Sequence, residues 1–321
     1  MAKITVVIPN YNGLHFLKPC LESLEKQSIL ADLDLIVVDN GSKDGSKDFV
    51  LEKYPWAEFV AWDKNYGFCR AVNEGIKRAK GEYVFLLNND TIIDAQCCSY
   101  LLDAIEKSEK IFSVASKMIQ ANNPDKVDDA GNFYNALGWA FARGKGKPAK
   151  GYKESKEIFA ACAGAALYRR RVFDEIGFFD ENHFAYLEDV DIGYRGLIYG
   201  YQNLYEPKAL VYHVGSGTTG SRYNSFKVKY SARNNIYLLY KNMPLLQVFL
   251  NSPLLILGFG IKLVFFIPKG FGKDYLWGLK EGILLSASNR DKKVKFSWKH
   301  WKHYFFIQWQ LWVNLFRKIK N

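Results

Sequence analysis

The chain has 321 residues, 49% hydrophobic and 24% charged, which is the composition of a folded protein with one large domain plus an appendage, or with two domains. Its net charge of +11 is uneven: residues 222–321 hold 18 Lys and Arg against 3 Asp and Glu, whereas residues 1–221 hold 26 against 30. A basic tail that also carries five of the eight tryptophans indicates a partner for the tail and argues against a nucleic-acid-binding protein.

The number and spacing of the cysteines and the polarity of residues 1–9 indicate in which cellular compartment the protein resides. Residues 1–9 lack the apolar run of a signal peptide, since Lys3 and Thr5 interrupt it. The five cysteines are odd in number and show no CxxC spacing, and the adjacent Cys97 and Cys98 cannot easily both form disulfides. We therefore expect reduced thiols in a cytosolic protein.

Short apolar runs alternate with amphipathic stretches in the first ninety residues. Strands are predicted at residues 4–8, 33–38, 58–62 and 83–87, and helices at residues 14–27, 49–53 and 68–79. Near-continuous apolar strands separated by helices predict an α/β fold with a mostly parallel sheet that is buried on both faces.

The middle of the chain is less regular. Residues 142–156 are polar and glycine-rich, which predicts a mobile loop. A run of small residues follows at 160–168, an acidic helix begins near residue 187, and a short strand is predicted at 210–212.

Polar side chains gather where the predicted strands end. The clusters are Asn10-Tyr11-Asn12, Asp39-Asn40, Asp63-Lys64-Asn65 and Asn88-Asn89-Asp90. Open α/β sheets bind ligands beyond the carboxyl ends of their strands, so these clusters predict one binding site. The absence of GxGxxG after the first strand argues against an NAD site, and the absence of GxxxxGK[ST] argues against a P-loop hydrolase.

Three features are candidates for chemistry. Asp90 either holds Mg²⁺ or Mn²⁺ or ends its strand as an Asx turn. Glu188, Asp189 and Asp191 fall in the first turn of a predicted helix, where the helix dipole stabilises acids whatever their function. Their crowding favours a cation or a substrate hydroxyl among them, and an ionised carboxylate beside a hydroxyl can act as a general base. His213 precedes a Gly/Ser/Thr loop at 215–221, so it is either structural or a metal ligand beside a phosphate-binding loop.

Six sequence blocks follow one another over about the first 240 residues. They are VVIPNYNG (6–13), VVDNGSKDGS (37–46), NYGFCRAVNEG (65–75), LLNND (86–90), FAYLEDVDIGYR (184–195) and HVGSG (213–217). Together they resemble the family-2 glycosyltransferases, and most nearly the bacterial rhamnosyltransferase-like branch that builds cell-surface polysaccharides. Each block alone is weak, but six in order make the resemblance specific.

The resemblance implies a GT-A fold for residues 1–240 and a nucleotide diphosphate sugar as donor. It implies that the donor is bound by Pro9, Asn10, Tyr11, Asp39, Asn65, Arg70, Asn88 and Asn89, and that Asp90 and His213 hold Mg²⁺ or Mn²⁺. Gly164, Ala165 and Glu188 fall where the family shapes the acceptor pocket. Asp189 matches the general base, while Glu188 and Asp191 would orient the site or the acceptor. Asn88 stands where the bare metal motif has Asp, which leaves one carboxylate for the cation.

By this resemblance the chain is expected to be a metal-dependent inverting hexosyltransferase that extends a lipid-linked or cell-surface polysaccharide. dTDP-rhamnose is the leading donor, and UDP-hexose and UDP-galactofuranose stay open because the motifs do not encode pocket shape. A catalytically silent nucleotide- or glycan-binding subunit is the alternative, against which Asp90, Asp189 and His213 argue.

Residues 241–321 form a separate helical segment by composition. Residues 244–268 are strongly apolar but interrupted by Asn251, Ser252 and Pro253, so the longest clean stretch is too short to span a bilayer comfortably. Residues 297–320 place six aromatic residues near one helical face with basic residues on its borders; the aromatic residues are Trp298, Trp301, Phe305, Trp309, Trp312 and Phe316.

Such a face suits the headgroup region of an anionic membrane, or it packs on the catalytic domain or on a second subunit, giving a homodimer. We expect a peripheral protein at the cytoplasmic face of the cell membrane, with a lipid-linked saccharide as acceptor and no nucleic acid as partner.

Overall fold

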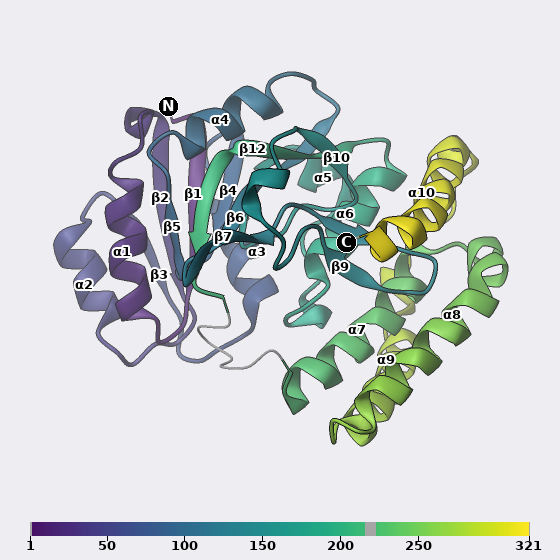
Figure 1. The fold of residues 1–321 in the computed structure, drawn as a ribbon. Coiled ribbons are helices and arrows are strands. Elements are labelled where there is room, and N and C mark those ends of the chain that lie inside the picture. Colours follow the sequence, from purple (N-terminus) through teal and green to yellow (C-terminus); the bar gives the residue numbers. More distant parts are fainter. Residues whose placement is uncertain (1, 216–222, 321) are drawn as a thin grey trace.

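A ten-stranded sheet organises the first two thirds of the chain in a computed structural model that describes residues 2–215 and 223–320 (Figure 1). Its main path runs β10-β12-β6-β11-β4-β1-β2-β3, and β5 and β7 join β12 and β6. The strands are β1 (Ile4–Asn10), β2 (Leu33–Asp39), β3 (Glu58–Ala61), β4 (Tyr83–Leu87), β5 (Thr91–Ile93), β6 (Ile111–Gln120), β7 (Asn123–Asp129), β10 (Lys156–Ile158), β11 (Ala165–Arg169) and β12 (Gln202–His213).

The four strands predicted from the first ninety residues lie side by side and parallel, in the order β3-β2-β1-β4. Strand β11 is inserted antiparallel between β4 and β6, and β12 is parallel to β6. The mostly parallel α/β sheet predicted from the apolar runs is therefore confirmed.

Helices cover both faces of this sheet. On one face lie α1 (Leu14–Leu24), α2 (Ser46–Lys53) and α4 (Cys97–Ile105), and on the other lie α3 (Phe68–Arg78), α5 (Val172–Ile176) and α6 (Glu188–Ile198). Alternate residues of β1 belong to the two different cores, because successive side chains of a strand point to opposite faces. The helix predicted at 49–53 begins three residues earlier, at Ser46.

Gly75 allows α3 to lie directly on β1. A Cβ at residue 75 would come within 2.2 Å of Val7 Cγ1, a distance that no side chain tolerates. The glycine in the NYGFCRAVNEG block therefore has a packing role, since it sets the depth at which α3 sits against the sheet.

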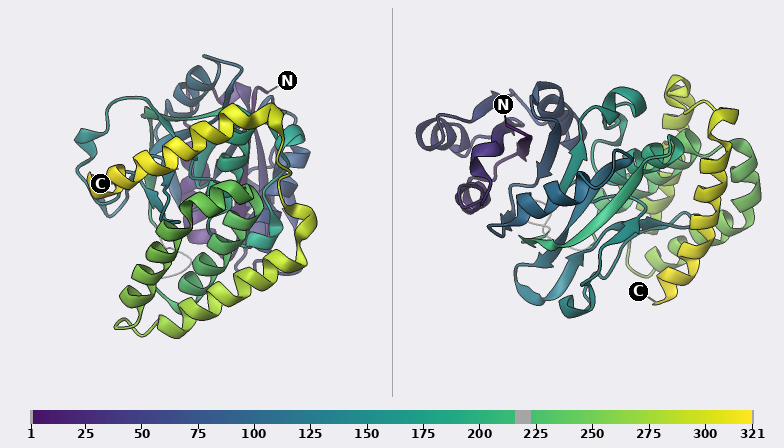
Figure 2. Two further views of the ribbon diagram at one scale, coloured as in Figure 1. Left: turned by 90° about the vertical axis from the view of Figure 1, so that its right-hand side faces the viewer. Right: turned by 90° about the horizontal axis from the view of Figure 1, so that it is seen from above.

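The rest of the chain forms helices beside the sheet (Figure 2): α7 (Ser225–Asn242), α8 (Leu245–Phe266), α9 (Gly272–Ser288) and α10 (Trp301–Lys320). Helix α9 approaches α7 closely at two glycines. A Cβ at Gly278 would lie 2.5 Å from the carbonyl oxygen of Lys229, and one at Gly282 would lie 2.5 Å from that of Arg233. Helix α10 contacts α6 and the strand pair β8 (Asn132–Tyr134) and β9 (Ala140–Ala142).

Helix α8 continues through residues 251–253, where the sequence predicted an interruption. Pro253 cannot donate to the carbonyl of Phe249, but the Ser252 hydroxyl donates to that carbonyl at 2.8 Å and replaces the missing bond. With 22 residues and a mean hydropathy of 1.9, α8 is the one helix in the described part of the chain that is long and apolar enough to cross a membrane. The expectation of a stretch too short to span a bilayer is thus corrected.

The C-terminal helices bury both polar and apolar side chains and expose large apolar ones. Asn251 of α8 and Gln308 of α10 are buried and exchange two hydrogen bonds, at 2.8 and 2.9 Å. The outward surface is formed by large apolar side chains, among them Leu246, Phe249, Ile256, Val264, Phe305, Trp309 and Phe316. This apolar surface, which we define as the exposed face of α8 and α10, differs from the polar outer face of a helix that packs on a soluble core.

The predicted loop at 142–156 is irregular, with one short 3₁₀ turn at Ala149–Gly151. It is tied to the sheet by an ion pair between Lys145 and Asp128 at 2.9 Å, and its mobility stays a prediction. Of the predicted phosphate loop at 215–221, residues 216–221 lie outside the described residues.

Candidate active site

A cavity of about 500 Å³ opens at the carboxyl ends of the parallel strands. Each of the four polar clusters contributes to its wall, as predicted. The contributing cluster residues are Asn10, Tyr11, Asn40, Asn65, Asn88, Asn89 and Asp90, and Pro9, Gly164, Glu188, Asp189 and His213 line the same space. The sheet therefore brings together most of the predicted donor, acceptor, metal and catalytic residues.

Side-chain amides form an ordered polar floor in this cavity. Asn89 Nδ2 donates to Asn10 Oδ1 at 2.7 Å, and Asn40 Nδ2 donates to Asn65 Oδ1 at 3.0 Å. Asn65 Oδ1 also accepts from the backbone N–H of Gly67 at 2.8 Å. Because each amide is fixed by a neighbour, the floor offers a preset pattern of donors and acceptors to a polar ligand.

Asp90 and His213 meet at one end of the cavity. His213 Nε2 lies 3.3 Å from Asp90 Oδ1, and His213 Nδ1 lies 2.8 Å from Asp128 Oδ2. Burial alone would lower the pKa of His213, but the hydrogen bonds and charges of Asp128 and Asp90 raise it to about 9. Asp128, at the end of β7, was not predicted; it orients the imidazole from behind.

Among residues 2–215 and 223–320 no group of three His, Cys, Asp or Glu side chains could hold a metal ion. Asp90 and His213 supply one carboxylate and one imidazole, which is a donor set that fits Mn²⁺ or Mg²⁺ with remaining ligands from water and substrate phosphate. The imidazole would have to lose its proton to act as a ligand.

Glu188 and Asp189 begin α6 and line the same cavity. Asn132 Nδ2 donates to Asp189 Oδ2 at 2.7 Å, and the backbone N–H of Val190 donates to Asp189 Oδ1 at 2.7 Å. Burial raises the pKa of both carboxyls above their ordinary values, and the charge of Asp189 raises that of Glu188 further. Two carboxyls of elevated pKa in one cavity are suited to proton transfer near neutral pH.

Residues 184–187 connect the sheet side of the cavity with α6 in a strained conformation. Phe184, Tyr186 and Leu187 have φ values of 61°, 72° and 65°, in the left-handed region that such residues rarely adopt. Phe184, Ala185 and Tyr186 line the cavity. Strain of this kind is concentrated at functional sites, where the surrounding structure enforces it.

The structure places four predicted site residues outside the cavity wall. Asp39 Oδ1 accepts from the backbone N–H of Ser42 at 2.9 Å and stabilises the turn behind Asn40. The Arg70 guanidinium lies over the ring of Tyr66, at 4.3 Å. Ala165 is buried in β11. Direct ligand contacts by these three residues stay predictions.

Asp191 is the fourth, and it points away from the cavity. Its carboxylate accepts from Arg195 Nη2 at 2.7 Å and from Lys241 Nζ at 3.0 Å, and it is fully buried. Burial opposes ionisation, but the two cations hold its pKa well below the usual range. Asp191 can therefore affect the site only by fixing α6, as an orienting residue.

Several cavity residues were not singled out from the sequence. They are Gly67, Phe68, Cys162, Ala163, Phe184, Ala185, Tyr186, Phe226 and Lys227. Phe184 to Tyr186 belong to the FAYLEDVDIGYR block, which gave a signal for their position. Phe226 and Lys227 come from α7, and no local pattern distinguishes them.

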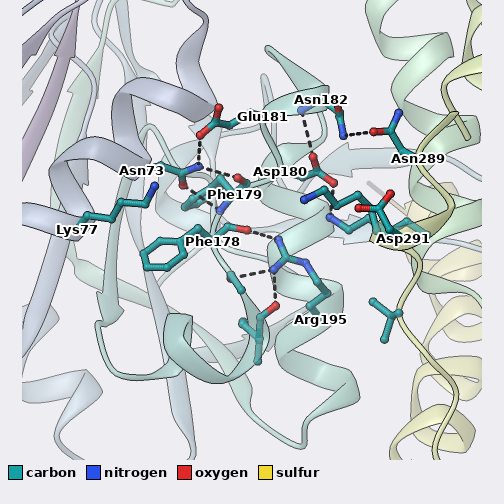
Figure 3. A pocket seen from close by; sticks show the side chains of 15 residues that line it. Asn73, Lys77, Phe178, Phe179, Asp180, Glu181, Asn182, Arg195, Asn289 and Asp291 are labelled. Atoms are coloured by element: carbon teal, nitrogen blue, oxygen red, sulfur yellow. Dashed lines mark hydrogen bonds and ion pairs between the residues drawn. The ribbon is translucent and has the colours of Figure 1, made fainter.

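A second cavity, of about 660 Å³, lies between α3, the segment before α6 and residues 289–294 (Figure 3). Asp180 at its wall pairs with Lys241 at 2.7 Å, and Arg195 donates to the carbonyls of Ile176, Gly177 and Phe178. Its buried charges therefore compensate one another, and it lies away from the strand ends that carry the polar clusters.

The chain is similar in sequence and in fold to known proteins. Residues 5–177 match the family model described as Glycosyl transferase family 2. The chain is 25% identical over 219 residues to a poly-beta-1,6-N-acetyl-D-glucosamine synthase of Staphylococcus epidermidis, covering 65% of this chain and 51% of that protein. The chain thus spans about half the length of that relative.

A second relative is the N-acetylglucosaminyl-diphospho-decaprenol L-rhamnosyltransferase of Mycobacterium tuberculosis, at 25% identity over 213 residues, with 59% of this chain and 68% of that protein covered. Among solved structures, GalNAc-T7 with UDP, GalNAc and Mn²⁺ superposes with a TM-score of 0.61 at 17% identity, covering 74% of this chain and 48% of that one. This likeness shows the fold, and the expected GT-A type of α/β fold is confirmed.

Proposed function

The chain belongs to glycosyl transferase family 2, and we propose that it is a metal-dependent inverting hexosyltransferase that uses a nucleotide diphosphate sugar. The observation that carries the proposal is the arrangement across one cavity: amides and Asp90 on the strand side, and Asp189 fixed by Asn132 on the α6 side. A donor bound on the amide floor would present its sugar toward Asp189.

In the proposed reaction, Asp189 takes the proton of an acceptor hydroxyl while the hydroxyl oxygen attacks C1 of the donor sugar. The bond from C1 to the diphosphate oxygen breaks on the opposite face, so the anomeric centre inverts and a nucleoside diphosphate leaves. Asp90 and His213 would hold Mg²⁺ or Mn²⁺, which when bound neutralises the charge of the departing diphosphate. Asn132 keeps Asp189 aimed at the nucleophile.

For the donor we propose a dTDP-linked rhamnose. The mycobacterial relative is named as an L-rhamnosyltransferase, whereas the staphylococcal relative is named as an N-acetylglucosamine polymer synthase. UDP-hexoses are the competing donors. The acceptor that we propose is a lipid-linked or cell-surface polysaccharide, in keeping with the decaprenol-linked saccharide in the mycobacterial relative's name.

We propose that residues 1–240 are the catalytic domain and that residues 241–321 associate with the cytoplasmic face of an anionic membrane. The support is the apolar surface of α8 and α10, on which Trp309 is 59% and Phe305 is 73% exposed, next to a strongly basic sequence. Its exposure disfavours the alternative in which this face packs on the catalytic domain.

Flotation with liposomes of anionic and of neutral lipid tests the membrane proposal. We expect the intact protein to float with anionic vesicles, and a variant with Phe305, Trp309 and Phe316 changed to Ser to float poorly. A protein that stays at the bottom with both kinds of vesicle and sediments as a dimer would favour a homodimer that buries this surface.

Calorimetric titration of dTDP and UDP, each with and without Mn²⁺ or Mg²⁺, tests the donor site. We expect metal-dependent binding and a preference between the two nucleotides that indicates the donor. Asp189→Asn should keep this binding and lose transfer. A folded protein that binds neither nucleotide would leave the silent glycan-binding subunit as the better interpretation.

A further inference from the structure

We propose that Asn234 and Arg233 of α7 are positioning residues, which hold residues 183–187 in the strained conformation that delivers Glu188 and Asp189 to the cavity. This proposal rests on the proposed transferase function for its catalytic consequence. The mechanical part, that these two side chains enforce the loop conformation, stands on contacts alone.

Within residues 183–187 one backbone hydrogen bond is made, from the Ala185 N–H to the His183 carbonyl at 2.7 Å, and it cannot by itself fix three residues in an unfavourable conformation. Phe184, Tyr186 and Leu187 are not glycine, yet all three have left-handed φ values. A short segment of L-residues does not adopt such a conformation unless neighbouring groups enforce it. The neighbours must therefore supply fixed contacts to the backbone of this segment.

Asn234 supplies these contacts from one buried amide. Its Nδ2 lies 2.9 Å from the carbonyl oxygen of His183, 2.8 Å from that of Ala185 and 2.8 Å from that of Tyr186. The side chain is fully buried, so water cannot replace it. One donor group shared among three nearby carbonyls can be satisfied only when the backbone between them curls back on itself.

Arg233 fixes both the loop and the amide. Its Nη2 donates to the carbonyls of Asn182, at 2.7 Å, and His183, at 2.9 Å. Its Nε donates to Asn234 Oδ1 at 2.9 Å, which holds the amide with its nitrogen toward the loop. The guanidinium lies over the ring of Tyr230 at 4.3 Å, so it is itself held in place.

Residues 183–187 are connected both to the start of α3 and to the start of α6. The carbonyl of Phe184 accepts from the backbone N–H of Phe68, where α3 begins beside the donor amides. Leu187 immediately precedes Glu188 and Asp189 at the start of α6. Loosening the loop would therefore displace Asp189 relative to the donor, and a shift of about 1 Å in a reacting group can lower a rate about a hundredfold.

The test compares Asn234→Asp with a matched control, Asn235→Asp. Asn235 is the next residue of the same helix and is also buried, but its amide joins Tyr134 and Gly138 and does not touch the loop. Arg233→Met is the second loop variant, because it removes two carbonyl contacts from a less buried position and preserves the test if Asn234→Asp does not fold.

Hydrogen exchange by mass spectrometry measures directly whether Asn234 and Arg233 hold the loop, an arrangement that we call the clamp. We expect the peptide that covers residues 183–187 to exchange at least about tenfold faster in Asn234→Asp and in Arg233→Met, and at the wild-type rate in Asn235→Asp. Wild-type exchange in both loop variants would overturn the clamp, and so would equal acceleration in Asn235→Asp.

The catalytic consequence is measured as the rate of donor hydrolysis. Water is the nucleophile, and dTDP-rhamnose or a UDP-hexose is the probe. We expect Asn234→Asp to lower the rate of nucleoside diphosphate release about a hundredfold, with the nucleotide Kd within about threefold of wild type. A parallel loss of nucleotide binding, or an unchanged rate, would contradict a positioning role. A wild-type protein that neither binds nucleotide nor releases it would instead refute the proposed function, and exchange alone would then decide the clamp.

Discussion

Asn132 gives the sharpest prediction about Asp189, the proposed general base, because it donates the one side-chain hydrogen bond that Asp189 receives among the described residues. In Asn132→Leu the amide is replaced by an apolar group of similar size. A hydrogen bond to a charged group contributes about 1.5–3 kcal/mol, and one pKa unit corresponds to about 1.36 kcal/mol. Losing the bond destabilises the ionised form, so we expect the pKa of Asp189 to rise by about one to two units.

In the proposed mechanism Asp189 acts as a base, and this role fixes the direction of the pH effect. Burial already raises the pKa of Asp189 above its ordinary value, and transfer requires the ionised form. The rate of nucleoside diphosphate release should therefore rise with pH in the wild type, with the midpoint displaced upward by about one to two units in Asn132→Leu. Well below the midpoint the variant should be about 10 to 100 times slower, and at high pH it should approach the wild-type rate.

The assay is the initial rate of donor hydrolysis or transfer from pH 5 to 9, together with the same change in an Asp189→Asn background. There the Asn132 substitution should have no further effect, because the charge that it stabilises is gone. A loss of equal size at every pH would refute the reasoning, since it would show that Asn132 supports the fold and does not tune Asp189.

Three further changes test other parts of the structure. Asp90→Asn should weaken Mn²⁺-supported nucleotide binding about tenfold or more and leave metal-free binding unchanged, as measured by calorimetry. Asp191→Asn should lower the free energy of unfolding by about 3–5 kcal/mol in urea, because Arg195 loses its carboxylate partner and Lys241 keeps only Asp180. Since the folded-state pKa of Asp191 is depressed, its contribution is present above about pH 4 and is lost as pH falls, so this variant and the wild type should converge in acid. Gly75→Ala should lower the free energy of unfolding by about 1–3 kcal/mol through its contact with Val7, and Val7→Ala should recover part of that loss; equal melting temperatures for wild type and Gly75→Ala would contradict the packing argument.

The part of the cavity formed at the strand ends was predictable because it is local in sequence. The end of each apolar strand can be recognised from the sequence, and Asn10, Asn65 and Asp90 lie at or within four residues of such ends. One topological rule therefore predicted that they share a cavity. Asp189 was also found, because the acidic start of its helix falls within a family block.

The supporting residues were not predictable in the same way. Asn132 meets Asp189 across 57 positions, and Asn234 meets Tyr186 across 48, and no periodicity in the sequence relates them. The break expected at Pro253 was wrong for a different reason: the Ser252 hydroxyl satisfies the carbonyl that proline leaves free, which is a contact of side-chain geometry and not of propensity.

Helix α7 faces two ways, toward residues 183–187 through Arg233 and Asn234 and toward α9 through the glycine contacts. This has a consequence for modular exchange between relatives. A chimera that joins residues 1–240 of one protein to the tail of another would combine α7 with a foreign α9. The close contacts at Gly278 and Gly282 would then be lost unless the foreign helix also has small residues there. A junction before Ser225 would transfer α7 and α9 together. Residues 183–187 of the native protein would then contact a foreign α7, which must supply the hydrogen bonds that Arg233 and Asn234 make. Exchange of residues 241–321 between relatives is therefore expected to require matching changes in α7.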